Sequence, residues 1–465
     1  MSVGAPEVVL EQLRHLPGGE ALLEVAAGRG DVELVGGAVR DLLLGREPRE
    51  LDVVVGGEGA SFASGGALFA QELAARLDTE AEVDEHERFG TALVEWDSGR
   101  IDVATRRAES YASPGALPDV RAGTPEEDLE RRDFTVNAIA LPLGGPHKGK
   151  LRQPRHLPAR EDLESGRLRV LHEHSFSDDP TRLLRLARYG ARLGFEVEDH
   201  TAALAREALA ARALDTVSGA RIGAELRLAL SEPDALAALA ALRQFGVLGA
   251  LHPRLRFEQP TASEALALLP ADGRPDLALL ASLVLPPALL ADRRSRDLRS
   301  VGDDRSRETR AFGANPRFDQ RAEIVALLDR WDFPAGDRDR VAAAATAVPR
   351  LIEALPGAKR PSALRAVALG VPVEGVALAG ALKGGDSAGM ENEGGEPLVR
   401  LAARRWLTEI RHVRLQITGD DLLAAGIPEG PEIGRRLERV LKLRLDGELA
   451  DGRDAELTAS LEARA

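Results

Sequence analysis

The sequence predicts an α+β protein, in which a head with a mixed sheet is followed by an all-helical remainder. Up to about residue 145, short apolar segments alternate with helix-like segments. From about residue 160 the pattern is helical almost to the end, and Ala, Leu and Arg dominate the second half. With 465 residues, of which 44% are hydrophobic and 29% charged, the chain is typical of a globular protein with roughly two to four domains.

The expected elements of the head are short strands separated by helices. Apolar runs rich in β-branched residues predict the strands, and helical periodicity predicts the helices. A long loop containing Pro and Gly begins at Ser113 and leads to Arg131. The strands are expected at 32–35, 51–55, 80–84, 89–96 and 100–104, and the helices at 38–45 and about 61–78.

The remainder is expected to be helical, with two polar interruptions. Residues 292–310, dense in Arg, Asp and Ser, predict an exposed loop or a mobile helix, and residues 383–397, rich in Gly, Asp and Glu, predict a flexible linker. The stretch 220–250 predicts one or two helices, and another helix carries an apolar stripe formed by Leu183, Leu184, Ala187 and Ala191. We therefore expect four domains, at 1–145, 146–215, 216–400 and 401–465.

The composition excludes several classes of protein. Without cysteine there are no disulfides, no zinc thiolate site and no thiol nucleophile. No apolar run approaches the roughly 18–20 residues of a membrane span, and the first thirty residues do not resemble a signal peptide, so we expect no membrane association and a cytoplasmic location. A net charge of −14 argues against a nucleic-acid enzyme, yet phosphate contacts depend on local potential, and arginines cluster in this chain.

The most informative segment is a Gly-Gly turn beside a pair of carboxylates. An apolar strand ends at Val35, and Gly36-Gly37 leads into a helix whose first N–H groups can approach a phosphate closely. The next strand opens with Glu50 and Asp52, and their i, i+2 spacing places both on one face. This combination predicts metal-assisted transfer from a nucleoside triphosphate. In isolation, such a pair would be two strand-end acids in water.

A third carboxylate, Asp102, stands in the apolar strand 100–104. If this strand neighbours 51–55, three acidic groups meet at one point, which suits two Mg²⁺ ions ~3.5–4 Å apart. One ion would lower the pKa of an attacking hydroxyl, and the other would neutralise the triphosphate. We expect Glu50 and Asp52 to hold Mg²⁺, with Asp102 as a weaker candidate for third ligand or proton acceptor.

Two adjacent arginines, Arg131 and Arg132, stand among acids between Asp128 and Asn137. One of them is expected to bind triphosphate oxygens through its forked guanidinium group. Asp133 and Asn137, four residues apart, could share a helix face and hold that geometry or touch the ribose. The alternative is a solvated run of charges.

The segment from Asp178 to Arg188 predicts the start of an amphipathic helix. Asp178 is the expected N-cap, with Pro180 in the first turn. Asp179 and Arg182 then share a face. There the Asp179 carboxylate could accept a hydrogen bond from the exocyclic amine of cytosine or adenine, and Arg182 could donate one to the ring of the base. Such a pair would select CTP and ATP over UTP and GTP. The alternative is an i, i+3 salt bridge above a solvated face formed by Arg182, Arg185, Arg188 and Arg192.

Together these segments resemble the class II tRNA nucleotidyltransferases and bacterial poly(A) polymerases, a branch of the polymerase-beta-like nucleotidyltransferases. The resemblance is dense from about residue 32 to 250, resumes at 417–422 and 430–434, and is slight between about 255 and 400. Further segments that carry it are 86–92, 102–105, Tyr111 with 114–118, 131–138, and 178–182 with 192–195.

The resemblance implies a seahorse-like arrangement of catalytic head, helical neck with a base-recognition motif, body, and a tail that binds RNA. It also implies addition of CMP and AMP to the tRNA 3′ end from CTP and ATP, with release of pyrophosphate and without a template. A partial CC- or A-adding enzyme, a poly(A) polymerase, or a non-catalytic RNA-binding descendant would carry the same motifs. The protein would be a monomer or a homodimer.

The resemblance also assigns residues. Gly36, Gly37 and Arg40 would contact the triphosphate, Arg131 and Arg132 the nucleotide, and Asp179 with Arg182 the base. Further candidates for nucleotide binding are Asp133, Asn137, Arg185 and Arg188. One departure concerns the metal: the family usually has two aspartates, and here the first is Glu50, whose extra methylene could slow catalysis or alter the metal preference.

Overall fold

The computed structural model describes residues 3–56, 65–77, 79–86, 90–290, 319–382 and 396–462. The chain forms two compact units, one of residues 1–225 with 244–250 and the other of 226–243 with 251–465. All described strands lie in the first unit, and the second is helical. The predicted α+β class with a helical remainder is therefore confirmed, whereas the finer division into four domains stays a prediction.

A six-stranded mixed sheet forms the centre of the head, in the order β3-β4-β5-β2-β1-β8. β2 and β5 are parallel, and the other neighbouring strands of this sheet are antiparallel. The sheet strands are β1 (Val32–Val35), β2 (Leu51–Val55), β3 (Glu82–His86), β4 (Thr91–Trp96), β5 (Gly99–Thr105) and β8 (Ala140–Pro142). The strands expected at 32–35 and 51–55 have those bounds, and the other three are displaced by one or two residues.

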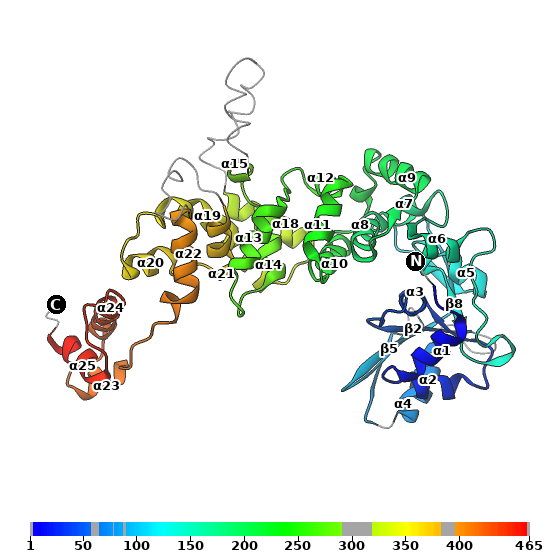
Figure 1. The fold of residues 1–465 in the computed structure, drawn as a ribbon, viewed down its shortest axis with the longest axis horizontal. Helices are drawn as coiled ribbons and strands as arrows, with labels where there is room; N and C mark the ends of the chain where they lie inside the picture. The colour runs from blue at the N-terminus through cyan, green and yellow to red at the C-terminus, as the bar shows by residue number, and fades with distance from the viewer. Residues whose placement is uncertain are drawn as a thin grey trace, which may run out of the picture. The chain divides into compact units, whose positions relative to one another are not determined.

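Helices cover the sheet and connect its strands (Figure 1). α3 (Gly37–Leu43) follows the Gly-Gly turn and contacts β1 and β2, and α4 (Gly65–Arg76) packs against β2, β4 and β5. Phe69, Ala70 and Leu73 of α4 are fully buried, and burial of such side chains contributes roughly 1.5–3 kcal/mol for a large one. The helix predicted at 61–78 is confirmed over 65–76, and residues 61–64 lie outside the described part. Two helices precede the sheet, α1 (Pro6–His15) and α2 (Gly19–Ala26).

The segment expected to be a long loop before Arg131 is structured in part. β6 (Arg107–Ser110) pairs with β7 (Asp119–Ala122), and α5 (Pro125–Glu130) follows. Thr124 caps α5, because its hydroxyl accepts from the Glu127 N–H while the Glu127 carboxylate accepts from the Thr124 N–H. The prediction of a loop is confirmed over residues 113–118 and wrong from Asp119 onward, and for α5 the overlooked signal was this capping box.

Helices dominate from α6 (Ala159–Ser165) onward, as predicted. The apolar stripe of α8 (Arg182–Leu193) is confirmed, with Leu183, Leu184 and Ala187 buried. The expected N-cap was wrong, since Asp178 ends α7 (Ser175–Asp178) and α8 begins at Arg182, which leaves Asp179 between the two helices. Further elements of the first unit are α9 (Asp199–Ala210) and β9 (Arg167–Leu168), which pairs with β10 (Glu196–Val197). α10 (Gly219–Leu230) and α12 (Val247–Leu251) each span a boundary between the units.

The second unit is helical, and its last helices lie in the segment predicted to be the tail, which stays a prediction as a separate domain. Thr418 and Asp421 make a capping box at α23, and Pro431 is the first residue of α24. Residues 292–310 lie outside the described part, and so do residues 383–395 of the linker predicted at 383–397. The helices are α11 (Ala235–Gln244), α13 (Gln259–Leu268), α14 (Pro275–Leu283), α15 (Pro287–Leu290), α18 (Gln320–Arg330), α19 (Ala335–Ala354), α20 (Pro361–Ala368), α21 (Val373–Ala381), α22 (Leu398–Thr408), α23 (Gly419–Ala424), α24 (Pro431–Leu445) and α25 (Arg453–Glu462).

No single helix among the described residues has both the length and the apolar character to cross a membrane. Only α20 and α21 taken together reach that length and composition, and they are bent by 111° relative to each other.

Candidate active site

The Gly-Gly turn lies directly beside the carboxylate pair. Gly36 has φ 69° and ψ −135°, a conformation that L side chains rarely adopt. A Cβ atom at this position would lie 2.9 Å from Nη1 of Arg132 and 3.7 Å from Oδ2 of Asp52. Only glycine therefore fits, and the turn brings backbone, acid and arginine together at one place.

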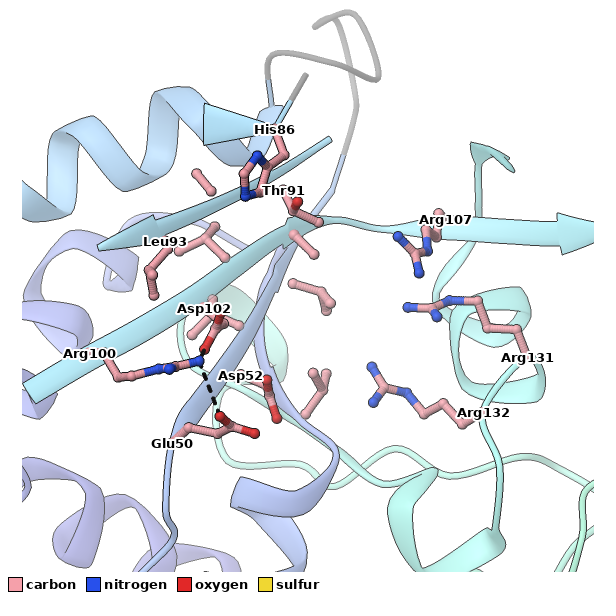
Figure 2. Close-up of a pocket in the computed structure, with 16 residues that line it drawn as sticks. Glu50, Asp52, His86, Thr91, Leu93, Arg100, Asp102, Arg107, Arg131 and Arg132 are labelled. Atoms are coloured by element: carbon pink, nitrogen blue, oxygen red, sulfur yellow. Dashed lines mark hydrogen bonds and ion pairs between the residues drawn. The ribbon is translucent and has the colours of Figure 1, made fainter. Parts of the chain in front are cut away.

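Two neighbouring parallel strands carry the acids. The register of β2 and β5 sets Asp52 beside Asp102, so both side chains emerge on the same face of the sheet. With Glu50 they line a pocket of about 450 Å³, and Figure 2 shows the three carboxylates directed toward a common space. The expected neighbouring of the two strands is confirmed, and the catalytic roles of the acids stay a prediction.

Arg100 joins two of the three acids. Its Nη2 donates to Oε2 of Glu50 at 3.3 Å and to Oδ2 of Asp102 at 2.9 Å. Among the described residues no three acidic or histidine side chains are arranged to hold a metal ion. Asp102 therefore binds an arginine in this structure, and its role as a third metal ligand or proton acceptor stays a prediction.

Asp52 is the acid whose charge is least compensated. Its burial is the largest cause that raises its pKa, and the charges of Glu50 and Asp102 add to it, so that the pKa reaches about 7 despite the opposing charge of Arg132. Carboxylate oxygens are the ligands that Mg²⁺ prefers in proteins. A divalent cation would compensate the negative charge of Asp52 and could also bind the neighbouring carboxylate of Glu50. These two residues are therefore suited to hold Mg²⁺.

Three guanidinium groups line the opposite side of the pocket (Figure 2). Arg131 and Arg132 both donate to Asp128, at 2.9 and 3.0 Å, and Arg107 and Arg131 share an oxygen of Glu109 at 3.0 and 3.1 Å. Burial raises the pKa of Asp128, but the charges of Arg131 and Arg132 outweigh this effect and hold the pKa at about 2. Triphosphate oxygens placed between this wall and a cation on the acids would meet positive charge from both sides.

α5 positions this arginine wall. Leu129 packs in a buried cluster with Val35 of β1, Val54 of β2 and Ala140 of β8. Asp128, on the same helix, is 2% exposed and anchors both arginines. The buried side of α5 thus helps to hold Arg131 and Arg132 in place, together with Glu109, which also accepts from Arg131.

The structure places Arg40, Asp133 and Asn137 away from this pocket. Arg40 is 1% exposed and donates to Asp41 and, at 2.5 Å, to Oδ1 of Asn137. Asn137 donates to Asp133 at 2.9 Å, and these two residues meet through a 3₁₀ turn (Thr135–Asn137) rather than along an α-helix face. In this arrangement Arg40 does not reach the pocket, because its guanidinium is used inside the protein, and the three residues position the segment that carries Arg131 and Arg132.

Arg185 and Arg188 belong to the same buried network. Arg185 donates to Oδ2 of Asp133 at 2.7 Å, and Arg185 and Arg188 both donate to Glu225, at 2.9 and 3.1 Å. The guanidinium groups of Arg40, Arg185 and Arg188 lie 4.9–5.4 Å from the ring centre of Tyr189. The alternative expectation of a solvent-exposed arginine face is wrong for Arg182 and Arg188, because these residues are buried, at 4% and 5% exposure.

Asp179 and Arg182 are close in sequence but have separate partners. Asp179 accepts from Arg221 at 2.6 Å and from the Thr181 N–H, while Arg182 donates to Ser175 at 2.6 Å and to the carbonyl of Arg131 at 2.7 Å. The i, i+3 salt bridge is absent because the chain is not helical between these residues. Arg182 nevertheless ties the neck segment to the arginine wall.

Sequence reasoning missed Arg100 and Arg107, which both line the pocket. Each stands two residues before an acid on the same strand face and donates to an acid of that strand, Arg100 to Asp102 and Arg107 to Glu109. An Arg-x-Asp or Arg-x-Glu pattern in a strand was the available signal.

A mixed sheet with a glycine turn, an acid pair and an arginine wall defines a nucleotidyltransferase head. The poly A polymerase head domain matches residues 32–169, and the probable RNA and SrmB-binding site of polymerase A matches residues 194–258. The chain belongs to the family of tRNA nucleotidyltransferases and poly(A) polymerases, which are enzymes.

Relatives within this family differ in the nucleotides that their names specify. An A-adding tRNA nucleotidyltransferase of Geobacter sulfurreducens is 32% identical over 97% of this chain and 48% of its own length. A CC-adding tRNA nucleotidyltransferase of Deinococcus radiodurans is 36% identical over 56% of this chain and 70% of its own length. A solved CCA-adding enzyme in complex with ATP has a TM-score of 0.69 at 26% identity, over 99% of this chain and 100% of that one. The chain spans about half the length, or less, of the curated A-adding relatives.

Proposed function

We propose that this protein is a template-independent nucleotidyltransferase that adds CMP, AMP or both to the 3′ end of tRNA, from CTP and ATP, with release of pyrophosphate. Membership of the family supports tRNA nucleotidyl transfer as the general reaction. The observation that carries the proposal is the pocket itself, in which the Glu50 and Asp52 carboxylates face Arg107, Arg131 and Arg132 beside the glycine turn.

The reaction is an in-line displacement at phosphorus. The 3′-hydroxyl oxygen of the RNA forms a bond to the α-phosphorus, the bond from that phosphorus to the bridging oxygen breaks, and pyrophosphate leaves. Arg131 and Arg132, held by Asp128, bind the departing phosphates, and Asp102 is a candidate to accept the hydroxyl proton. Glu50 and Asp52 would hold Mg²⁺, which supplies a Lewis acid that makes the hydroxyl a better nucleophile and neutralises the triphosphate.

Selection of the base is assigned to Asp179 and Arg182. A carboxylate accepts from the exocyclic amine of cytosine or adenine, and the carbonyl oxygen of uracil or guanine at that position repels it. Asp179 already accepts from Arg221, so its orientation is fixed before a base arrives. Equal incorporation of UTP and CTP would remove this role from the pair.

The tail is assigned to RNA binding. α24 begins at Gly430-Pro431, and a helix start of this kind can bind backbone phosphate. Its competing role is structural, since Asp446 just after α24 accepts from the backbone and hydroxyl of Ser362. Deletion of residues 416–465 separates the two roles, because a tail that binds RNA affects tRNA binding more than triphosphate binding.

Five alternatives remain to be distinguished, namely full CCA addition, CC addition, A addition, poly(A) addition and RNA binding without catalysis. The name of the Geobacter relative favours A addition, and that of the Deinococcus relative favours CC addition. A poly(A) polymerase would extend beyond the complete end, and a non-catalytic descendant would bind tRNA without releasing pyrophosphate.

One experiment resolves these variants. The full chain is incubated with tRNAs that end before C74, C75 and A76 and with each labelled triphosphate, and product length and sequence are read. Asp52→Ala should abolish incorporation and leave the fold intact. Asp97→Ala, which removes an exposed acid in the turn between β4 and β5, is the matched control and should not change activity. Incorporation by Asp52→Ala at the normal rate would overturn the proposal.

A further inference from the structure

Arg100 occupies a position between the expected metal ligand Glu50 and the neighbouring acid Asp102. The Glu50 and Asp102 oxygens that it contacts lie 3.3 and 2.9 Å from the same nitrogen, Nη2. Figure 2 shows the guanidinium directed into the pocket from β5, on the side opposite the arginine wall. The arginine is therefore a cation placed within the acid cluster itself.

The length of residue 50 matters for this contact. Glu50 precedes β2 and reaches across to Arg100 on β5, and an aspartate at position 50 would be one methylene shorter. Glu50, which replaces the usual first aspartate, thus makes an ion pair with Arg100. An aspartate at the same backbone position would not reach Arg100 at this distance.

A guanidinium and a divalent cation compete when they need the same carboxylate oxygen. The guanidinium and the metal ion are both attracted to the ionised carboxylate. They also repel each other, because they would be close enough for charges to interact appreciably even near a protein surface. Glu50 cannot give its full coordinating capacity to a metal while Arg100 keeps its bond. Binding of the metal therefore includes the cost of releasing this arginine.

We propose that Arg100 is a positioning residue that competes with the metal ion for Glu50 and so sets the metal affinity of the site. The inference rests on the metal site of the proposed function. It gives the glutamate at position 50 a physical role: the longer side chain creates the competition, and the affinity for metal is lower than two free carboxylates would provide.

The test measures metal binding directly and needs no turnover. Mn²⁺ is used as the probe, and its binding to the full chain is followed by calorimetry and by the loss of the free Mn²⁺ paramagnetic resonance signal. Arg100→Gln should bind Mn²⁺ roughly 3- to 10-fold more tightly than the unaltered protein, because a nearby positive charge is removed and Glu50 is freed. Arg14→Gln is the matched control: Arg14 is equally exposed, at 45% against 46%, and pairs with acids outside the pocket.

A second variant separates direct competition from general electrostatics. In the Glu50→Asp background Arg100 no longer reaches residue 50, so Arg100→Gln should change the Mn²⁺ affinity by less than roughly twofold. An equal gain in both backgrounds would overturn the proposal, and so would unchanged or weaker Mn²⁺ binding by Arg100→Gln. A chain that shows the expected Mn²⁺ affinities but adds no nucleotide to tRNA would sink the proposed function and leave this inference standing.

Discussion

Replacing Asp128 by asparagine tests whether the arginine wall depends on one buried acid. Asp128 is 2% exposed and accepts from Arg131 and Arg132. Its pKa of about 2 lies below the ordinary 3.8, and a shift of that size corresponds to about 2 kcal/mol of stability at neutral pH. Asp128→Asn should lower the local opening free energy by that amount and also weaken triphosphate binding, because Arg131 and Arg132 both lose the Asp128 carboxylate, although Arg131 keeps Glu109.

The assay is native-state hydrogen exchange of peptides covering residues 124–137, combined with calorimetric titration of CTP and ATP. A loss of about 2 kcal/mol accelerates exchange by roughly 30-fold. Glu130→Gln removes an exposed acid from the same helix and is the matched control. Unchanged exchange and unchanged triphosphate affinity in Asp128→Asn would refute the reasoning.

The sign of the pH dependence follows from the lowered pKa of Asp128. The stabilisation is fully present above the unfolded value of 3.8 and is lost as the pH falls toward about 2. The difference between the unaltered chain and Asp128→Asn should therefore be constant from pH 7 to 5 and shrink below pH 4. A difference that grew on acidification would contradict the assignment.

Three further predictions concern the turn, the buried network and the tail. Gly36→Ala should cost about 1–3 kcal/mol and reduce triphosphate affinity by displacing Arg132, whereas Gly45→Ala, at φ 68° with open space around it, should cause strain without the loss of affinity in calorimetry. Glu225→Gln should destabilise the first unit by about 3 kcal/mol in chemical denaturation, because Arg185 and Arg188 lose their shared carboxylate, while the exposed Glu207→Gln should be neutral. Deletion of residues 416–465 should weaken tRNA binding more than triphosphate binding in filter and calorimetric assays; equal losses would make the tail merely structural.

The acid cluster could be predicted from sequence because it depends on local periodicity. Glu50 and Asp52 share a face through their spacing of two residues, and Asp102 needed only one further assumption, that its strand lies beside β2. The glycine turn was equally local, since two glycines between a strand and a helix leave few other conformations.

The hydrogen-bond partners of the arginines could not be predicted in this way. Arg40 follows the turn and was expected at the triphosphate, yet its partner Asn137 is 97 residues away, and its ring contact Tyr189 is on α8. Asp179 pairs with Arg221, 42 residues later, rather than with Arg182. An arginine can satisfy an acid at any distance along the chain, so spacing alone does not identify its partner.

The parallel pairing of β2 with β5 also has a consequence for how the protein acquires its activity. Glu50 and Arg100 are 50 residues apart, so the intervening chain, including α4 and the β3-β4 hairpin, must close before these side chains can meet. Contacts of such long sequence separation form slowly, because the entropy of loop closure is lost before the contacts repay it. A nascent head emerging from the ribosome therefore lacks the complete pocket until the chain has been synthesised at least as far as Arg132.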